Sequence, residues 1–265
     1  MLTNAKIKEI KKLNERSKAR REAGLFIIEG PKMFSEAPLE WIEEVFVTEE
    51  FLQNADAELK TNSDDKIGEM IKWLEHTIVT KEQMSKISDT MTPQGILCVM
   101  RQPEYSIEHM MVTKKRGKLF VLLEDIQDPG NLGTIFRTAE GAGASGIIMS
   151  RGCVDIFNPK TIRSTMGSIY RVPFVYADDF ADAINKVKGN GINVYAAHLK
   201  GEKYYDEITY EDAAFLIGNE GNGLKAETAK LSDTYIKIPM EGELESLNAA
   251  VATAILMYEH NRQHR

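Results

Sequence analysis

Glu124-Asp125-Ile126-Gln127-Asp128-Pro129-Gly130-Asn131-Leu132-Gly133-Thr134-Ile135-Phe136-Arg137-Thr138-Ala139 is the most informative segment of this chain. The apolar run 119–123 just before it predicts a buried strand. Asp128, Pro129 and Gly130 predict a tight turn, and Asn131 is a favourable N-cap for a following helix. The segment therefore predicts a strand, a turn and a helix in direct succession.

The polar groups of this segment indicate a site at the end of the strand. The apolar side chains of the expected helix share one face, formed by Leu132, Ile135, Phe136 and Ala139. Arg137 falls about 150° from the centre of that face, at the ~100° per residue of a helix. Ligands of open parallel sheets bind at the carboxyl ends of the strands. Asn131 and Arg137 therefore predict a site for an anionic or polyhydroxyl substrate.

Strands and helices alternate from residue 118 onward, which predicts an α/β fold with a parallel sheet covered on both faces. Strands are expected at 119–124, 146–150, 172–176, 192–197, 214–218 and 234–239, and helices at 132–142, 159–167, 178–189, 224–230 and 246–261. Before this region the pattern predicts a basic helix at 4–22 and short strands at 25–28, 45–48, 77–79 and 96–100. The expected domains are 1–101 and 118–265, joined by a polar linker at 102–117 in which Ile107, Met110 and Met111 pack down.

Composition narrows the class of protein. The chain has 265 residues, 43% of them hydrophobic, which is ample for a core. Cys98 and Cys153 lie in apolar contexts and predict buried thiols of a reducing compartment, with a disulfide as the minor alternative. No metal-ligand spacing appears, so no metal is expected. No apolar run suits a signal peptide or approaches the ~18 residues of a membrane span, so a cytoplasmic protein is expected.

Charge is unevenly distributed along the chain. The net charge of −7 argues against non-specific nucleic-acid binding over the whole surface. Residues 1–32, however, carry nine Lys or Arg against four Glu. One interpretation is a solvated helix with Glu–Lys pairing, and the other is an arm that contacts RNA phosphates. The candidates for RNA contact are Lys8, Lys11, Lys12, Arg16, Arg20 and Arg21.

Two glycine-rich stretches have different meanings. Residues 141–146 match G-x-G-x-x-G, but they follow a helix and precede a strand, which is the wrong context for a dinucleotide fingerprint. Helix capping explains them better. Residues 215–224 form a strand that enters a loop with Gly218, Gly221 and Gly223, where a ligand can approach the backbone closely. An ordinary connection is the alternative for this loop.

A third polar segment follows the strand that ends at Pro239. Ser246 is a good N-cap for the last helix, and Asn248 follows it. Leu247, Val251, Ile255 and Tyr258 form one stripe of that helix, and small or apolar residues lie elsewhere on its surface. A helix that is apolar on more than one side is buried in the core or in a subunit interface.

Together these three segments resemble the signature motifs of the SpoU (TrmH) family of RNA ribose 2′-O-methyltransferases. The motifs are residues 131–139, 216–224 and 238–252, in the family's order and spacing. The resemblance covers residues 118 to about 258, and residues 155–167 resemble the family's middle segment. More weakly, residues 26–30 and the basic helix before them are similar to the family's RNA-substrate-binding domain.

The resemblance implies a C-terminal domain threaded into a trefoil knot, a homodimer, and S-adenosylmethionine as cofactor. The positions that match cofactor contacts or lie beside them are Gly218, Asn219, Gly221, Ile238, Pro239, Met240 and Leu247. Those that match catalytic or substrate-site positions are Asn131, Arg137, Glu220, Ser246 and Asn248. The implied activity is methylation of a ribose 2′-hydroxyl, with ribosomal RNA as the first substrate class and transfer RNA as the second.

The chemistry of these residue types suggests their roles. An arginine side chain stays protonated at neutral pH, so Arg137 is a poor base and is better suited to anchor a phosphate and hydrogen-bond the 2′-oxygen. Glu220 could accept a proton or hold Arg137, and the two asparagines would orient their neighbours. Two alternatives remain open: a non-catalytic RNA-binding or ribosome-assembly factor on the same fold, and a nucleotide-dependent oxidoreductase that depends on the misplaced glycine pattern.

Overall fold

The computed structural model describes residues 2–61, 66–112, 117–244 and 246–265. The chain forms two compact units, which are Met1–Pro103 with Asp155–Tyr170, and Glu104–Val154 with Arg171–Arg265. The segment Asp155–Tyr170, expected within the C-terminal domain, thus groups with the N-terminal unit. Residues 113–116 of the expected linker and residue 245 of the third motif lie outside the described residues.

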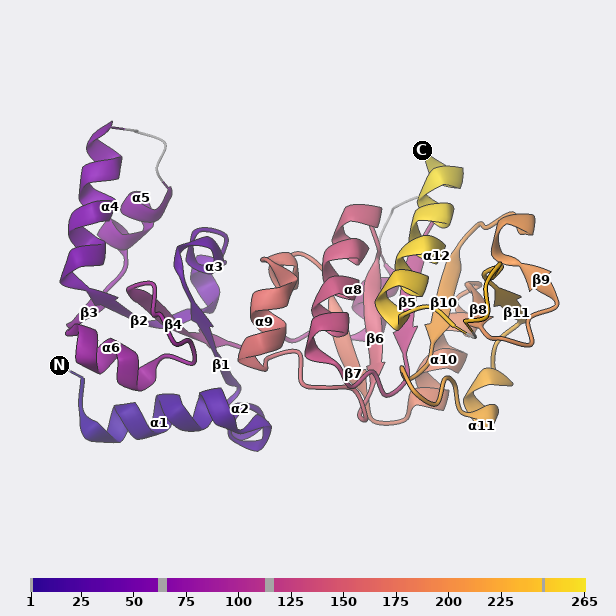
Figure 1. Cartoon of the computed structure of the whole chain (residues 1–265), viewed down its shortest axis with the longest axis horizontal. Helices are drawn as coiled ribbons and strands as arrows, with labels where there is room; N and C mark the ends of the chain where they lie inside the picture. The colour runs from indigo at the N-terminus through magenta and orange to yellow at the C-terminus, as the bar shows by residue number, and fades with distance from the viewer. Residues whose placement is uncertain (1, 62–65, 113–116, 245) are drawn as a thin grey trace. The chain divides into compact units, whose positions relative to one another are not determined.

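The first unit is a four-stranded sheet with helices on both faces (Figure 1). Its strands are β1 (Leu25–Glu29), β2 (Ile42–Thr48), β3 (His76–Val79) and β4 (Ile96–Arg101), in the order β1-β4-β2-β3. Only β2 and β3 pair in parallel, and the other neighbours are antiparallel. Its helices are α1 (Asn4–Glu15), α2 (Ser17–Ala23), α3 (Pro31–Ser35), α4 (Glu49–Thr61), α5 (Lys66–Trp73), α6 (Lys81–Ile87) and α9 (Pro159–Thr165).

The basic helix is anchored in the core of this unit. Ile10 and Leu13 of α1 are buried with Met84 and Ile87 of α6 against the sheet. The helix expected at 4–22 is broken into α1 and α2 at Arg16, whose backbone is extended. This break turns the second half of the basic segment into a separate short helix.

The second unit contains a seven-stranded parallel sheet in the order β7-β6-β5-β10-β8-β11-β9. The strands are β5 (Leu119–Leu123), β6 (Gly146–Ser150), β7 (Phe174–Ala177), β8 (Asn193–Ala197), β9 (Lys203–Tyr204), β10 (Ala213–Ile217) and β11 (Thr234–Lys237). The helices are α7 (Ile107–Met111), α8 (Pro129–Ala142), α10 (Phe180–Gly189), α11 (Ala226–Ala229) and α12 (Ala249–His264). This confirms the α/β fold with a parallel sheet, and β9 is the strand that the pattern missed.

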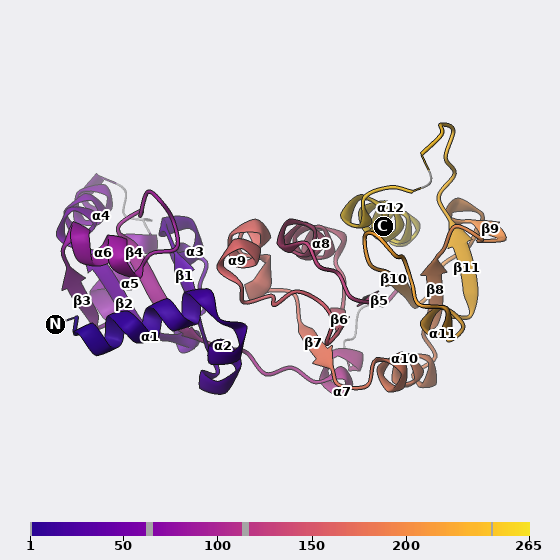
Figure 2. The same cartoon turned by 60° about the horizontal axis from the view of Figure 1, so that its bottom comes forward.

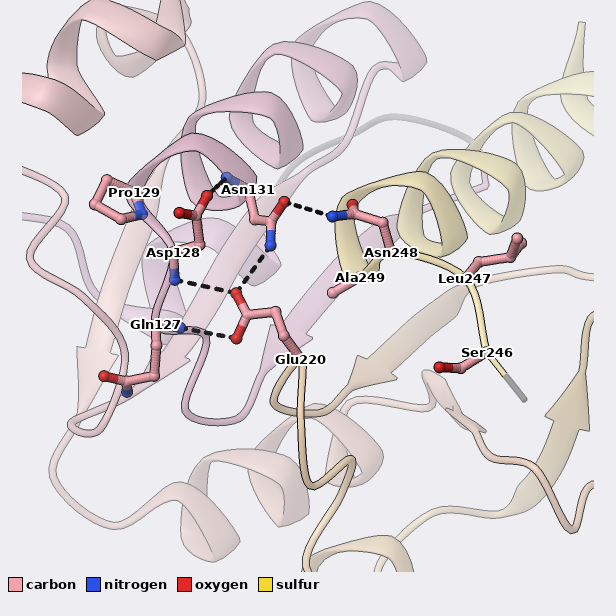
Figure 3. Close-up of a pocket in the computed structure, with 9 residues that line it drawn as sticks. All are labelled: Gln127, Asp128, Pro129, Asn131, Glu220, Ser246, Leu247, Asn248 and Ala249. Atoms are coloured by element: carbon pink, nitrogen blue, oxygen red, sulfur yellow. Dashed lines mark hydrogen bonds between the residues drawn. The ribbon is translucent and has the colours of Figure 1, made fainter. Parts of the chain in front are cut away.

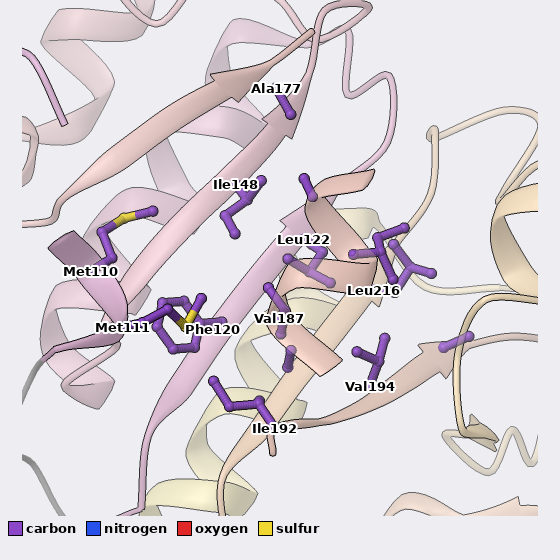
Figure 4. Close-up of a cluster of buried hydrophobic side chains, with 14 residues drawn as sticks. Met110, Met111, Phe120, Leu122, Ile148, Ala177, Val187, Ile192, Val194 and Leu216 are labelled. Atoms are coloured by element: carbon purple, nitrogen blue, oxygen red, sulfur yellow. The ribbon is translucent and has the colours of Figure 1, made fainter. Parts of the chain in front are cut away.

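Helices cover both faces of this sheet. Figure 2 shows α8 and α12 side by side on one face and α7 and α10 on the other. The core on the α10 side consists of apolar side chains from the sheet and the helix, mostly aliphatic, among them Leu122, Ile148, Val187 and Leu216 (Figure 4). Met110 and Met111 of α7 join it, so part of the expected linker does pack down. In the part of the chain that is described, no helix is long and apolar enough to cross a membrane.

Two helix starts differ from expectation. Asp128, not Asn131, is the N-cap of α8, because its carboxylate accepts from the Asn131 backbone N–H at 2.8 Å. The residues expected as a turn are thus the cap and first residues of the helix, with Pro129 at a position that needs no N–H donor. Asn248, not Ser246, is the N-cap of α12. The side chain of Asn131 is therefore not used for capping. The side-chain oxygen of Asn248 caps α12, and its amide nitrogen remains available for another hydrogen bond.

Candidate functional site

A chain of hydrogen bonds joins the three sequence motifs at the carboxyl ends of the strands (Figure 3). Asn248 Nδ2 donates to Asn131 Oδ1 at 2.9 Å, and Asn131 Nδ2 donates to Glu220 Oε1 at 3.0 Å. The carboxylate of Glu220 also accepts the backbone N–H groups of Gln127 and Asp128, each at 3.1 Å. Segments about ninety and more residues apart in sequence are thus held together by side chains that we singled out from the sequence.

Glu220 is the centre of this network and is held as a carboxylate. Partial burial raises the pKa of Glu220, but hydrogen bonds from the Asn131 amide and from the backbone of Gln127 and Asp128 outweigh burial and bring the pKa below its usual value. The Asn219 amide also donates to this carboxylate, at 3.5 Å, and a carboxylate with a lowered pKa and four donors is a weak proton acceptor. The geometry therefore favours a positioning role for Glu220 over that of a general base.

Two adjoining cavities meet at this network. The first is open, about 620 Å³, and is lined by Gln127, Asp128, Pro129, Asn131, Glu220, Ser246, Leu247, Asn248 and Ala249. The second is about 650 Å³, within the ~300–1,000 Å³ typical of small-molecule sites. Four residues line both cavities: Glu220, Ser246, Leu247 and Ala249. A ligand in the second cavity would therefore lie directly beside one in the first.

The second cavity brings together every residue that the resemblance assigned to the cofactor. These are Gly218, Asn219, Gly221, Ile238, Pro239, Met240 and Leu247. Further lining residues come from the turn after β8, which the sequence reasoning missed: His198, Leu199 and Lys200. The signal that could have found them is position, because this turn follows a strand of the same parallel sheet at the same edge.

The two glycines of the second motif have different reasons to be glycine. A Cβ on Gly218 would lie 2.2 Å from the backbone carbon of Gly223, so the fold of the loop itself requires glycine there. A Cβ on Gly221 would meet only Asn219 Oδ1, at 3.6 Å, which is ordinary contact. The protein alone therefore leaves Gly221 free to carry a side chain, and no contact of the described residues requires glycine there.

The glycine-rich loop is fastened to the end of β5 by residues that the sequence reasoning did not assign. The buried carboxylate of Glu124 accepts the Lys225 backbone N–H at 2.8 Å and the Thr228 hydroxyl at 2.5 Å. Lys225 Nζ lies 2.6 Å from Asp125 Oδ2. The hydrogen bond from Lys225, followed by one from the Ser150 hydroxyl, keeps the pKa of Asp125 below its usual value despite partial burial. Adjacent acids directly after a buried strand were the available signal.

Arg137 is not part of this assembly within one chain. It lies on the exposed side of α8, lines neither cavity, and has no hydrogen bond or ion pair with the described residues. The expectation that Glu220 holds Arg137 is therefore wrong within one chain, because the carboxylate of Glu220 is occupied by Asn131 and two backbone donors.

The basic helix needs one correction. Arg20 is 2% exposed, its guanidinium lies 2.7 Å from Asp155 Oδ2, and it donates to the carbonyls of Leu13 and Asn14 at the end of α1. It is a structural residue that satisfies helix-end carbonyls, so it is not available to RNA. The other five candidates are exposed and form no ion pair within the described residues: Lys8, Lys11, Lys12, Arg16 and Arg21.

The fold and the paired cavities define an α/β enzyme with room for a nucleotide-sized cofactor beside a polar substrate site. Residues 118–258 match the SpoU rRNA Methylase family, and residues 4–98 match the MRM3-like substrate binding domain. The chain belongs to the SpoU rRNA Methylase family, which is S-adenosylmethionine-dependent, and is an RNA methyltransferase. The resemblance found in the sequence is confirmed.

Relatives of known sequence and structure agree with this assignment. The chain is 34% identical to the 23S rRNA (guanosine(2553)-2′-O)-methyltransferase RlmP of Bacillus subtilis, over 96% of this chain and 95% of that protein. An S-adenosylmethionine-bound rRNA methyltransferase from Sinorhizobium meliloti has a TM-score of 0.81 at 31% identity, covering 99% of this chain and 96% of that one. The SpoU methyltransferase AviRb from Streptomyces viridochromogenes has a TM-score of 0.83 at 25% identity, covering 98% of each chain.

Proposed function

We propose that this protein methylates a ribose 2′-hydroxyl of ribosomal RNA with S-adenosylmethionine as methyl donor, and that large-subunit ribosomal RNA is the substrate. The observation that carries this proposal is the Asn248–Asn131–Glu220 chain of hydrogen bonds, located where a cofactor-sized cavity meets an open polar one. The substrate class rests on the Bacillus relative, which is named for 23S rRNA. We also propose a cytoplasmic location, since both cysteines are free thiols.

The second cavity suits the cofactor. The bare backbone at Gly221 allows close approach of a flat group, and Leu247 supplies an apolar wall. When bound, S-adenosylmethionine supplies a methyl group on a positively charged sulfur, so the methyl group is already activated. The carboxylate of Glu220 lies at the boundary with the open cavity, where it would favour that positive charge.

The remaining task of this chain is to align the ribose oxygen and to stabilise its charge as the proton leaves. Ser246 lines both cavities and has a hydroxyl that can bind the ribose. Asn131 and Asn248 keep Glu220 and the two helix starts in register. Arg137 would anchor the adjacent phosphate and donate to the 2′-oxygen, because its guanidinium stays charged throughout.

A homodimer would bring Arg137 to the site of a second copy. Arg137 is exposed on α8, and α12, which packs beside α8, exposes the large apolar side chains of Val251 and Tyr258. Val251 and Tyr258 are seven residues apart and therefore lie on one side of α12, where a second chain could cover both. We therefore propose that two chains associate through α8 and α12, and that the expected knot of the C-terminal segment organises this face. The knot remains a prediction.

Methyl transfer to RNA is the direct test of the proposed function. With methyl-labelled S-adenosylmethionine and deproteinised ribosomal RNA, we expect one 2′-O-methylated nucleotide in large-subunit RNA and none in transfer RNA. Replacing Glu220 by Gln should reduce the rate by about 100-fold, because an amide nitrogen then faces donors instead of an acceptor. Glu227→Gln, the same exchange at an exposed position of α11 that lines neither cavity, should leave the rate unchanged. Incorporation of the labelled methyl group into transfer RNA would favour transfer RNA as the substrate. If neither RNA were methylated, the alternative of a non-catalytic ribosome-assembly factor would be favoured.

The basic helix α1 gives a prediction about salt. Neutralising Lys8, Lys11 and Lys12 to Ala should reduce the salt slope of RNA binding by up to about 0.7–0.9 for each phosphate that the helix no longer neutralises. Cofactor affinity should not change. Deletion of the helix is a poor test, because Ile10 and Leu13 belong to the core of the first unit. Filter binding across a series of salt concentrations measures the slope. A slope equal to that of the wild type would contradict the proposal that α1 contacts RNA phosphates.

A further inference from the structure

A lysine without an acidic partner lines the proposed cofactor cavity. Lys237 ends β11, and its ammonium forms no hydrogen bond or ion pair with the residues that the structure describes. Glu241 lines the same cavity but is exposed and makes no ion pair with Lys237 in that part of the chain. A half-buried cation at a cavity wall without an acidic partner favours an anionic ligand.

The Tyr204 ring lies against the ammonium of Lys237, and two further contacts hold the backbone of Lys237. Strand β9 pairs with β11 so that Tyr204 is opposite Lys237, and Lys237 Nζ lies 4.8 Å from the centroid of the Tyr204 ring. The turn before β9 packs closely against the backbone of Lys237, since a Cβ on Gly201 would lie 2.8 Å from the Lys237 backbone nitrogen. An aromatic ring orients a cation without neutralising it, so the charge stays available to a ligand.

The acidic and basic side chains that line this cavity are Glu220, Glu241, Lys200 and Lys237, and of these Lys200 and Glu241 are exposed to solvent. Glu220 lies where the cavity meets the open one, whereas Lys237 and Tyr204 line only the cofactor cavity. S-adenosylmethionine carries a sulfonium, an ammonium and one carboxylate. For the methyl group to reach a ribose, the sulfonium would have to face the open cavity, and Glu220 is the charged residue that lines both cavities there. The carboxylate is the only anionic group of the ligand and is therefore the group that complements Lys237.

We propose that Lys237, held over the ring of Tyr204, binds the carboxylate of the methionine part of S-adenosylmethionine and selects ligands that carry it. This inference rests on the proposed function, since it takes the second cavity as the cofactor site. It makes Lys237 a specificity-determining residue outside the three sequence motifs. It also assigns a purpose to β9, the short strand that the sequence pattern did not reveal.

A pair of ligands that differ by one group tests the inference. Isothermal titration of the full chain would compare S-adenosylmethionine with decarboxylated S-adenosylmethionine, which keeps the sulfonium, the amine and the adenosine. For Lys237→Met we expect about a 10-fold or greater loss of affinity for S-adenosylmethionine, as for a lost charge-assisted hydrogen bond. The affinity for the decarboxylated ligand should stay equal or increase, because a repelling charge has been removed. Lys237→Arg should retain the preference for the carboxylated ligand.

Matched variants separate this effect from a general loss of charge or fold. Lys203→Met removes an exposed lysine of the same strand pair that does not line the cavity, and it should leave both affinities unchanged. If Lys237→Met weakens both ligands equally, or if Lys200→Met alone removes the preference, the assignment of Lys237 is overturned. If the wild-type chain binds neither ligand, the proposed cofactor site itself fails. Thermal unfolding of each variant, within a few degrees of wild type, shows that the fold is kept.

Discussion

Protein with Arg137→Ala and protein with Glu220→Ala, each nearly inactive alone, should regain methyl transfer when the two chains are coexpressed or allowed to exchange subunits. We expect each single variant to lose about 100-fold or more in rate, the usual effect of removing one group that stabilises developing charge or positions the reactants. Their mixture should recover to roughly a quarter of the wild-type rate, from the statistics of a two-fold dimer. The structure motivates this result, because Arg137 is exposed on α8 and lines neither cavity of its own chain.

The recovery follows from which chain supplies which residue. In a mixed dimer, one site would combine an intact Glu220 network with an intact Arg137 from the other copy, and the second site would lack both. If Arg137 served its own chain, no site in the mixture would be complete and no activity would return. A mixture of Arg137→Ala with Arg137→Lys is the control, since it can rebuild no wild-type site. Single-turnover methyl transfer, with light scattering to establish subunit exchange, measures the outcome.

The second large effect concerns the glycine-rich loop. Gly221→Val should weaken the binding of S-adenosylmethionine by about 100-fold or more, since a branched side chain would fill space beside the ligand that the backbone now leaves open. The unfolding temperature should change by only a few degrees, because a Cβ at this position meets only Asn219 Oδ1 at 3.6 Å. Calorimetric titration and thermal unfolding of the same sample measure both quantities.

Gly218→Val is the matched comparison, because it puts the same side chain on the same loop. Its Cβ would lie 2.2 Å from the backbone of Gly223, so the loop itself has to move. We expect this variant to lose both cofactor binding and stability. If Gly221→Val bound the cofactor as tightly as the wild type, the second cavity would not be the cofactor site. If both variants unfolded alike, the distinction drawn between the two glycines would be wrong.

The sequence was sufficient for the architecture of the second unit because its signals are local. Strands such as β5 and β10 are short apolar runs, and helices such as α8 and α10 show a 3.6-residue stripe beside them. Their alternation leaves few topologies other than a parallel sheet. The three motifs could also be expected to meet, since each follows a strand whose carboxyl end lies at the same edge.

Helix starts were less predictable. Asp128 and Asn131, or Ser246 and Asn248, are both good caps by residue type, and only the position of the first helical hydrogen bond decides between them. That position depends on how the loop before the helix is held. At α8 the Glu220 carboxylate, about ninety residues away, accepts the backbone N–H groups of Gln127 and Asp128 and so fixes Asp128 as the N-cap.

Residue types and their local order thus determined the fold class, the family and the set of polar groups that form the site, because hydrophobic periodicity and motif spacing are properties of neighbouring residues. Tertiary structure alone decided that Arg20 is buried against Asp155, 135 residues away, while Arg137 stays exposed and Lys237 faces the cavity. The physical reason is that desolvation and pairing of a charge depend on groups brought near it by folding. Which groups surround a given charge after folding cannot be derived from their separation along the sequence.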